Sequence, residues 1–153
     1  MAHSDLRIIY IDDDNNVCII TPIDNSGKTI EQIKEQIVPS GKSADIISKD
    51  KIPNSPYFLD AYDYASQKFS LNMSKAKEIH KNRIRQARIT KLAELDIEFQ
   101  KALETSASTT DIVAKKQALR DAPAASAIDS ASSTDELIAQ WDTSLLGDTP
   151  YKS

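Results

Sequence analysis

Few residues in this sequence have the types and spacing that metal binding or acid–base catalysis requires. The histidines are His3, close to the amino terminus, and His80, and the single cysteine is Cys18. No other histidine, cysteine or carboxylate lies three or four residues from His80, which is the spacing of zinc ligands on one helix face. Three glycines are too few for a loop that cradles phosphate. We therefore expect no enzyme, no catalytic residue, no metal site and no cofactor.

Two groups of carboxylates could in principle bind a metal ion or act as a catalytic pair. Asp12, Asp13 and Asp14 are adjacent, which suggests calcium, but the alternating spacing and the distal glutamate of a calcium loop are missing. A solvated turn between strands is the preferred interpretation. Glu94 and Glu98 are four residues apart on one predicted helix, with lysines nearby, and we interpret them as solvent-facing charges rather than as a catalytic pair.

Basic residues are concentrated in one part of the chain. Between residues 73 and 91, seven basic residues against Glu78 alone give +6, while the whole chain carries −4, so all other residues sum to −10. Three interpretations remain open: charges that pair with neighbours, a surface for an acidic protein, and a surface for nucleic acid. The basic residues are spread around the helix and lack the asparagine and serine pattern of a major-groove helix, so nucleic acid is the least favoured.

The segment that carries this charge predicts one long helix, from Met73 to about Leu103. It contains no glycine or proline, and its apolar residues recur every three or four positions. The carboxyl-terminal half has the larger apolar residues, and the basic half has smaller and more polar ones, so we expect the carboxyl-terminal half to be packed more tightly. The seam consists of Leu92, Leu95, Phe99 and Ala102 in one half and of Met73, Ala76, His80, Ile84 and Ala87 in the other.

Residues after the long helix predict a helical hairpin and a short final helix. A Ser/Thr-rich loop precedes a second helix, residues 111–120, and a short link makes two helices antiparallel neighbours. An Ala/Ser-rich linker then precedes a capping box that starts at Ser133, and we expect a helix with Leu137, Ile138 and Trp141 on its apolar face. So short a helix must dock on the rest of the chain or on a partner. The last ten residues are expected to be flexible.

The first half of the chain predicts a small α+β unit. Two β-branched segments joined by an Asp/Asn turn favour a hairpin that starts at Leu6, and Cys18 packs within its second strand. A turn over residues 22–27 leads to a short helix, residues 28–38, and to a third strand at residues 44–48. An aromatic cluster follows, and we expect it to pack in the core, with a platform for nucleic-acid bases as the alternative. Residues 66–72 are expected to form a joint between this unit and the long helix. The cluster comprises Tyr57, Phe58, Leu59, Tyr62 and Tyr64.

Taken together, these patterns predict an α+β chain in three parts. Residues 1–70 form the small α+β unit, residues 71–122 the helical hairpin with a basic first helix, and residues 123–153 the linker and docking helix. No signal peptide and no segment of about eighteen apolar residues are present, so we expect no membrane partner. The single cysteine fits a reducing compartment.

Two runs of the second half resemble small bacteriophage proteins encoded near tail and tail-fibre genes, of the tail assembly chaperone type. The runs are EIHKNRIRQARITKLAELDIEFQKALE and KKQALRDAPAASAIDSASSTDELIAQW. The matching features are the arginine-rich helix from Arg83 to Arg88, the Leu95-Asp96 pair, and the QALRD motif followed by Pro123. The first half, with TIEQI, VPSG and IPNSPYFLDAY, is similar to the amino-terminal unit of some of these proteins.

The resemblance implies a non-enzymatic tail-associated protein whose hairpin binds another tail or tail-fibre component. It would act in the host bacterial cytoplasm during assembly, or remain as a permanent adaptor protein of the tail or head–tail region. A small DNA-binding regulator and a homo-oligomer stay open as alternatives. The expected partner-binding residues are Arg83, Arg85, Arg88 and Lys91 for electrostatic docking, and Leu92, Leu95, Phe99 and Trp141 for apolar contact.

Overall fold

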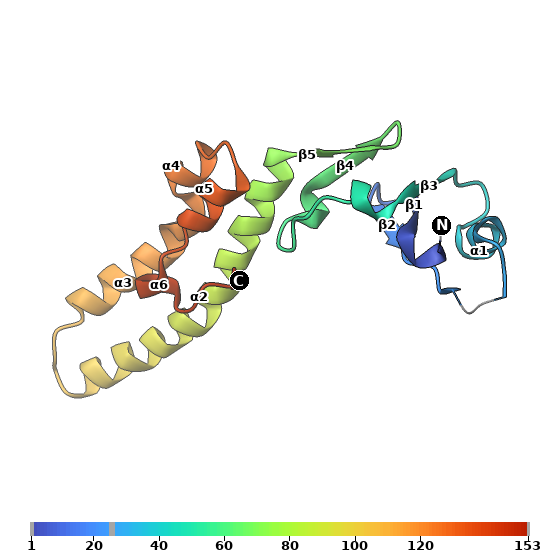
Figure 1. Ribbon diagram of the computed structural model, residues 1–153. Coiled ribbons are helices and arrows are strands. Elements are labelled where there is room, and N and C mark those ends of the chain that lie inside the picture. The colour runs from blue at the N-terminus through green and yellow to red at the C-terminus, as the bar shows by residue number, and fades with distance from the viewer. Residues whose placement is uncertain (1, 25–26, 153) are drawn as a thin grey trace. The chain divides into compact units, whose positions relative to one another are not determined.

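The computed structural model describes residues 2–24 and 27–152 and divides into two compact units (Figure 1). Residues 1–72 form unit 1, which contains all the strands, and residues 73–153 form unit 2, which is helical. The predicted α+β class is confirmed: antiparallel sheets and a short helix are followed by a long helix packed against a second one.

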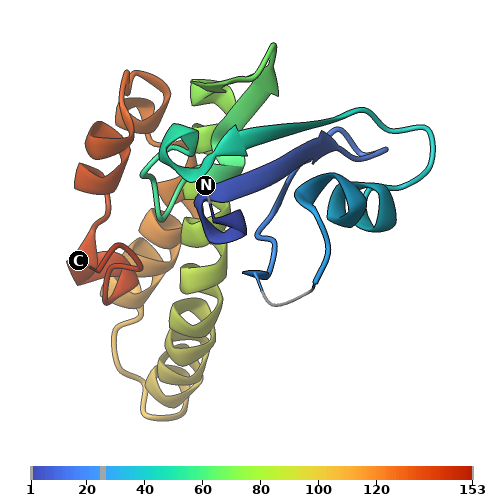
Figure 2. The ribbon, with the colours of Figure 1, turned by 45° about the vertical axis from the view of Figure 1, so that its right-hand side comes forward.

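Unit 1 is built on a three-stranded antiparallel sheet in the order β2-β1-β3 (Figure 2). The strands are β1 (Leu6–Ile11), β2 (Val17–Ile20) and β3 (Ala44–Ser48), as the β-branched runs predicted. In the register, Ile9 lies opposite Ile19 on one side and opposite Asp45 on the other.

Helix α1 (Ile30–Ile37) packs beside this sheet and begins with a complete capping box. The Thr29 hydroxyl accepts a hydrogen bond from the Gln32 N–H at 3.3 Å, and the Gln32 side chain accepts one from the Thr29 N–H at 2.9 Å. Ile30 and Ile33 are buried in a cluster with Ile8, so the helix covers one side of the core. The turn expected at residues 22–27 falls partly on residues 25 and 26, which lie outside the described residues.

A second hairpin, β4 (Tyr62–Ala65) and β5 (Lys68–Leu71), replaces the joint expected at residues 66–72. Its two-residue turn is formed by Ser66 and Gln67, whose φ angles are 51° and 60°. Such a turn normally uses Asn-Gly, so this one has no sequence signal. Tyr62 and Tyr64 of the aromatic cluster therefore lie on a strand.

Of the aromatic cluster, only Phe58 is fully buried; Tyr57, Leu59, Tyr62 and Tyr64 are half-buried. The Tyr64 hydroxyl donates to the Asp45 carboxylate at 2.8 Å, and its ring lies 4.8 Å from that of Phe69. Desolvation and this carboxylate raise the pKa of Tyr64. The cluster therefore contributes to unit 1 through polar tips as well as through buried area.

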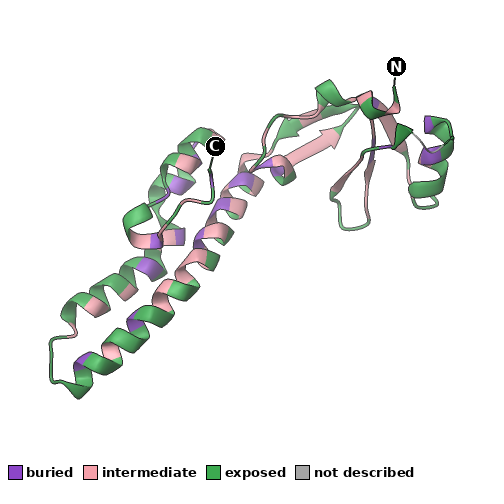
Figure 3. Ribbon diagram, turned by 60° about the horizontal axis from the view of Figure 1, so that its bottom comes forward, coloured by how far each residue is buried: buried purple, intermediate pink, exposed green. Residues whose placement is uncertain are grey.

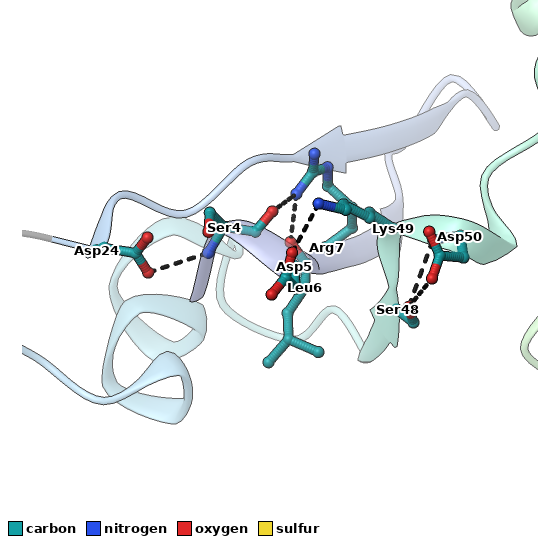
Figure 4. A network of polar contacts seen from close by, with 8 residues as sticks. All are labelled: Ser4, Asp5, Leu6, Arg7, Asp24, Ser48, Lys49 and Asp50. Carbon is teal, nitrogen blue, oxygen red and sulfur yellow. Dashed lines mark hydrogen bonds and ion pairs between the residues drawn. The ribbon is translucent and has the colours of Figure 1, made fainter. Parts of the chain in front are cut away.

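Polar contacts tie the start of β1 to its surroundings (Figure 4). The Arg7 guanidinium donates to the Ser4 carbonyl at 2.8 Å, and the Ser4 N–H donates to the Asp24 carboxylate at 3.0 Å. Lys49 pairs with Asp5 at 2.6 Å. Unit 1 also contains the 3-10 turns η1 (His3–Asp5), η3 (Lys49–Lys51) and η4 (Leu59–Ala61).

Unit 2 is a helical hairpin, and the rest of its chain returns along the first helix (Figure 1). Helix α2 (Met73–Glu104) and helix α3 (Thr110–Asp121) are joined by a short loop in which Ser106 has a φ of 55°. The remaining helical segments are η5 (Ala122–Ala124), α4 (Ser126–Asp129), α5 (Thr134–Ala139) and α6 (Thr143–Leu146).

The carboxyl-terminal segment is folded onto unit 2, which corrects the expected linker and flexible end. Ile128, Leu137, Leu146 and Tyr151 are all buried, with exposed fractions between 0% and 8%. Leu137 belongs to α5, which packs against α2, so the short helix docks on its own chain. The Ser133 hydroxyl accepts from the Glu136 N–H, but the Glu136 carboxylate accepts from Ser132, so the predicted capping box is only half formed.

The packing of α2 is the reverse of the expected one (Figure 3). In its first half, Ala76, His80 and Ile84 are at most 1% exposed. In its second half, Leu92 and Phe99 are only half-buried. The reason is that the carboxyl-terminal segment, which carried no strong helical pattern, covers the basic half.

No helix within the described residues has the length and the apolar character needed to cross a membrane.

Candidate protein-binding surface on the helical unit

Several lysines of the basic run contact the returning segment of their own chain. Lys77 donates to the Asp129 carbonyl and Lys81 pairs with the Asp129 carboxylate, both at 2.7 Å. The hydrogen bond from Lys81, with its positive charge, lowers the pKa of Asp129 below its ordinary value. These lysines therefore hold α4 against α2.

The basic residues proposed for docking also have partners inside unit 2. Arg85 donates to Asn82 at 2.6 Å and to Glu78 at 3.3 Å, both on its own helix. Arg88 donates to the Arg120 carbonyl at 2.9 Å, at the end of α3, where carbonyls lack helical partners. Lys91 lies 3.5 Å from the Glu94 carboxylate. Arg85, Arg88 and Lys91, which were expected to dock a partner, therefore have contacts within their own chain.

The apolar members of the predicted set lie at the packing interfaces of unit 2. Leu95 and Trp141 are each 9% exposed, and Leu92 and Phe99 are half-buried. The Phe99 ring lies 5.3 Å from the Lys116 ammonium of α3. These side chains stabilise the hairpin, and only their exposed edges are available to another protein.

Arg83 and Trp141 meet at one place, around a buried histidine. The imidazole of His80 is 0% exposed and stacks on the Tyr151 ring, with 5.7 Å between the ring centroids. Its Nδ1 lies 2.5 Å from the Tyr151 hydroxyl oxygen. Trp141 packs edge-on at 6.2 Å from His80 and 6.1 Å from Tyr151, and the Arg83 guanidinium carbon lies 5.1 Å from the Tyr151 ring centroid.

Burial determines the charge of this histidine. Desolvation, with a smaller contribution from the positive charge of Arg83, lowers the pKa of His80 to about 4, so its imidazole is neutral at pH 7. Its Nε2 has no hydrogen-bond partner among the residues that the structure describes. Within the described residues, no group of three His, Cys, Asp or Glu side chains is placed to hold a metal ion, and we interpret the cluster as a polar part of the core.

Beside this cluster lies a shallow apolar groove with a volume of about 460 Å³. Trp141 forms part of its wall, and α2 contributes Arg83 and the small side chain of Ala87. Its remaining lining residues are Ile79, Asn82, Gln86, Asp148 and Pro150. Trp141 is held in place by its own Nε1, which donates to the Gly147 carbonyl at 3.1 Å. The groove therefore has an apolar wall, a cation, amide groups and the Asp148 carboxylate, which is a suitable combination for a protein side chain.

Arg83 and Trp141 were both among the partner-binding residues expected from the sequence. The sequence did not predict that residues 148–151 would lie beside them. Tyr151 lies 71 residues from His80, and a single aromatic near the chain end gives no periodic pattern. The only signal was that His80 fell on the apolar stripe of α2, which required a polar partner if the histidine was buried.

The aspartate-rich turn of unit 1 is closed by its own hydrogen bonds. Asp12 accepts from the Asn16 N–H at 2.7 Å and from the Asn16 side chain at 3.0 Å, and these bonds lower the pKa of its carboxyl. Asp13 pairs with Lys42. This geometry fits the solvated turn that was preferred to a calcium loop.

No protein-family model, no curated protein and no solved structure matches this chain.

Proposed function

We propose that this chain is a non-enzymatic bacteriophage tail-associated protein that binds another tail or tail-fibre component through unit 2. The observation that carries the proposal is the groove whose lining includes both Arg83 and Trp141. Tryptophan and arginine are enriched among the residues that dominate protein–protein binding energy. The resemblance of the helical half to tail-associated proteins supplies the setting.

The chemistry of the groove defines the kind of segment that fits it. A volume of about 460 Å³ accepts two or three apolar side chains, and Ala87 leaves room for them against α2. Arg83 at the wall favours a carboxylate next to those apolar side chains, since a guanidinium binds a carboxylate with two parallel hydrogen bonds. We therefore expect a partner segment that carries a leucine or phenylalanine close to an aspartate or glutamate.

The proposal narrows the docking surface expected from the sequence to Arg83, Trp141 and their neighbours. Arg88 and Lys91 have partners within unit 2 and serve its stability in this proposal. Leu95 is buried and acts in the same way. An assembly chaperone and a permanent virion protein both use this groove, and mass spectrometry of purified particles distinguishes them by the absence or fixed copy number of the chain.

The test uses co-expression of the full chain with the tail and fibre proteins encoded by the same phage, followed by co-purification. Trp141 is the single tryptophan, so a protein labelled with 5-fluorotryptophan gives one ¹⁹F resonance that reports the groove. Binding of a purified tail component should shift this resonance, and Ala87→Phe, which fills the groove and adds no tryptophan, should reduce affinity at least about tenfold. The matched control is Val113→Phe, a change at an exposed position of α3. A complex that leaves the resonance unmoved, or that tolerates Ala87→Phe, would contradict the proposal.

A further inference from the structure

One face of α2 in its second half carries apolar side chains that no described part of the chain covers. Ile89 and Ile97 are 59% and 58% exposed, and the small Ala93 lies between them at a spacing of four residues. Gln86 and Gln100 continue the same face at both ends and are also exposed. Residues at this spacing line up along one side of a helix, so they form a continuous seam, which we call the Ile89–Ile97 seam.

The hairpin partner cannot cover this seam because it packs on another face. Leu95 and Ala102 are the buried residues of this half, and they point about 160° to 180° away from Ala93, the middle of the seam, on a helical wheel. The far end of α3 reaches Arg88, whose guanidinium donates to the Arg120 carbonyl, so α3 runs beside the length of α2 that carries the seam. The seam is therefore exposed because it faces away from α3.

The charge of α2 is segregated along the same helix. Residues 73–91 sum to +6, and residues 92–104 sum to −3, because Glu94, Asp96, Glu98 and Glu104 outnumber Lys101. A second copy of α2 laid antiparallel on the seam brings each basic half beside an acidic half. A parallel copy would place like charges together, which opposes association.

We infer that the Ile89–Ile97 seam is a self-association surface, on which α2 of a second copy packs antiparallel. One self-complementary patch used twice is the usual construction of a two-fold dimer. Ala93 at the centre lets two helix backbones approach closely, and the two isoleucines pack on either side of it. The inference uses a different face from the one that contains Leu95, and it rests on Ile89, Ala93 and Ile97, none of which lines the groove; Gln86 alone belongs to both.

The length of the seam sets the expected affinity. A core coiled-coil repeat has apolar residues at both seam positions of every heptad, whereas this seam has glutamines at its ends. We therefore expect a dissociation constant on the order of 10 to 100 µM for the dimer, so that monomer and dimer exchange at ordinary protein concentrations.

Sedimentation equilibrium of the full chain under reducing conditions, from about 5 to about 500 µM, tests the inference. The expected result is a monomer–dimer equilibrium that Ile89→Glu with Ile97→Glu weakens at least about tenfold, since two charges enter the apolar seam on each copy. The matched control, Val113→Glu on the exposed part of α3, should leave association unchanged. Far-ultraviolet circular dichroism verifies that both variants remain helical. A monomer at all concentrations, or equal weakening by the control, would overturn the inference.

Salt distinguishes the orientation of the pair. Attraction between opposite halves is screened by salt, so raising sodium chloride from about 0.05 to about 0.5 M should weaken an antiparallel dimer by about threefold or more. A parallel dimer would instead become tighter, because salt would relieve its repulsion. Tighter association at high salt would therefore overturn the antiparallel arrangement.

Discussion

The two halves of α2 lie on one unbroken helix but are held by different neighbours. The first half buries Ala76, His80 and Ile84 under the carboxyl-terminal segment, which reaches it from residues 122–151. The second half packs on α3 and keeps Ile89 and Ile97 exposed. The comparison teaches that the helix half with the poorer apolar pattern can be the better packed one, when a distant segment supplies the missing surface.

The difference has a thermodynamic consequence. Side chains that are almost fully buried lose most from truncation, because a cavity remains where neighbours cannot collapse. Half-exposed side chains lose much less, because water already solvates part of their surface. We therefore expect the first half of α2 and its cover to determine the stability of unit 2.

The largest expected effect comes from the carboxyl-terminal segment that packs on the first half of α2. Leu137→Ala removes a 0% exposed side chain of α5 and should lower the free energy of unfolding of unit 2 by about 3 to 4 kcal/mol. Leu103→Ala, at a 55% exposed position in the second half of α2, should cost less than about 0.5 kcal/mol. Urea unfolding followed by the fluorescence of Trp141 measures both. Equal costs would mean that the first half of α2 is not the better packed one.

Acid should weaken the first half before the second. The pKa of His80 is lowered to about 4 in the folded chain, against about 6.5 when unfolded, so the unfolded chain takes up a proton first as the pH falls. Stability is fully present above pH 6.5 and falls by about 3 kcal/mol between pH 6.5 and pH 4. His80→Gln should be less stable at pH 7 but should show a flatter profile across this range. An equally steep profile in the variant would assign the loss to carboxylates such as Asp129.

Removing the hydroxyl that contacts His80 should have an intermediate effect. Tyr151→Phe deletes the partner of the buried Nδ1, and a buried polar atom left unpaired costs about 1 to 2 kcal/mol. The aromatic stacking is retained in the variant, so the loss reports the polar contacts of the hydroxyl, with His80 and with Arg83. Hydrogen exchange should show reduced protection of the amides in residues 73–88. The protection of the amides in residues 92–104 should stay unchanged. A uniform loss over both halves would contradict a local role for Tyr151.

Local sequence signals were sufficient where neighbours in the chain determine structure. The capping box at Thr29, the Asp/Asn turn between β1 and β2 and the helical period of α2 each depend on residues a few positions apart, and each agrees with the structure. The antiparallel hairpin followed from a short polar loop. The fold class could therefore be predicted from the sequence.

Signals failed where structure depends on distant contacts or on rare backbone angles. Ser66 and Gln67 adopt positive φ without the glycine or asparagine that usually marks such a turn, so this turn and β5 were interpreted as a joint. The carboxyl-terminal order depends on burial of Tyr151 and Leu146 against helices far away in the sequence. In the candidate site, this long-range packing brings Trp141 to Arg83, and it also removes Leu95 from the accessible surface.

The smallest effect concerns two arginines of the basic run that were grouped together by sequence. Arg88→Gln removes a charged donor from the carbonyls at the carboxyl-terminal end of α3, which should cost about 1 kcal/mol of the unfolding free energy of unit 2. Arg85→Gln removes an exposed contact within α2 and should cost less than about 0.5 kcal/mol. Urea unfolding at low and high salt compares them, because only the exposed pair is strongly screened. If Arg85→Gln proved the more costly, the first half of α2 would depend on its own surface charges, and the contrast with the second half would no longer rest on the carboxyl-terminal cover.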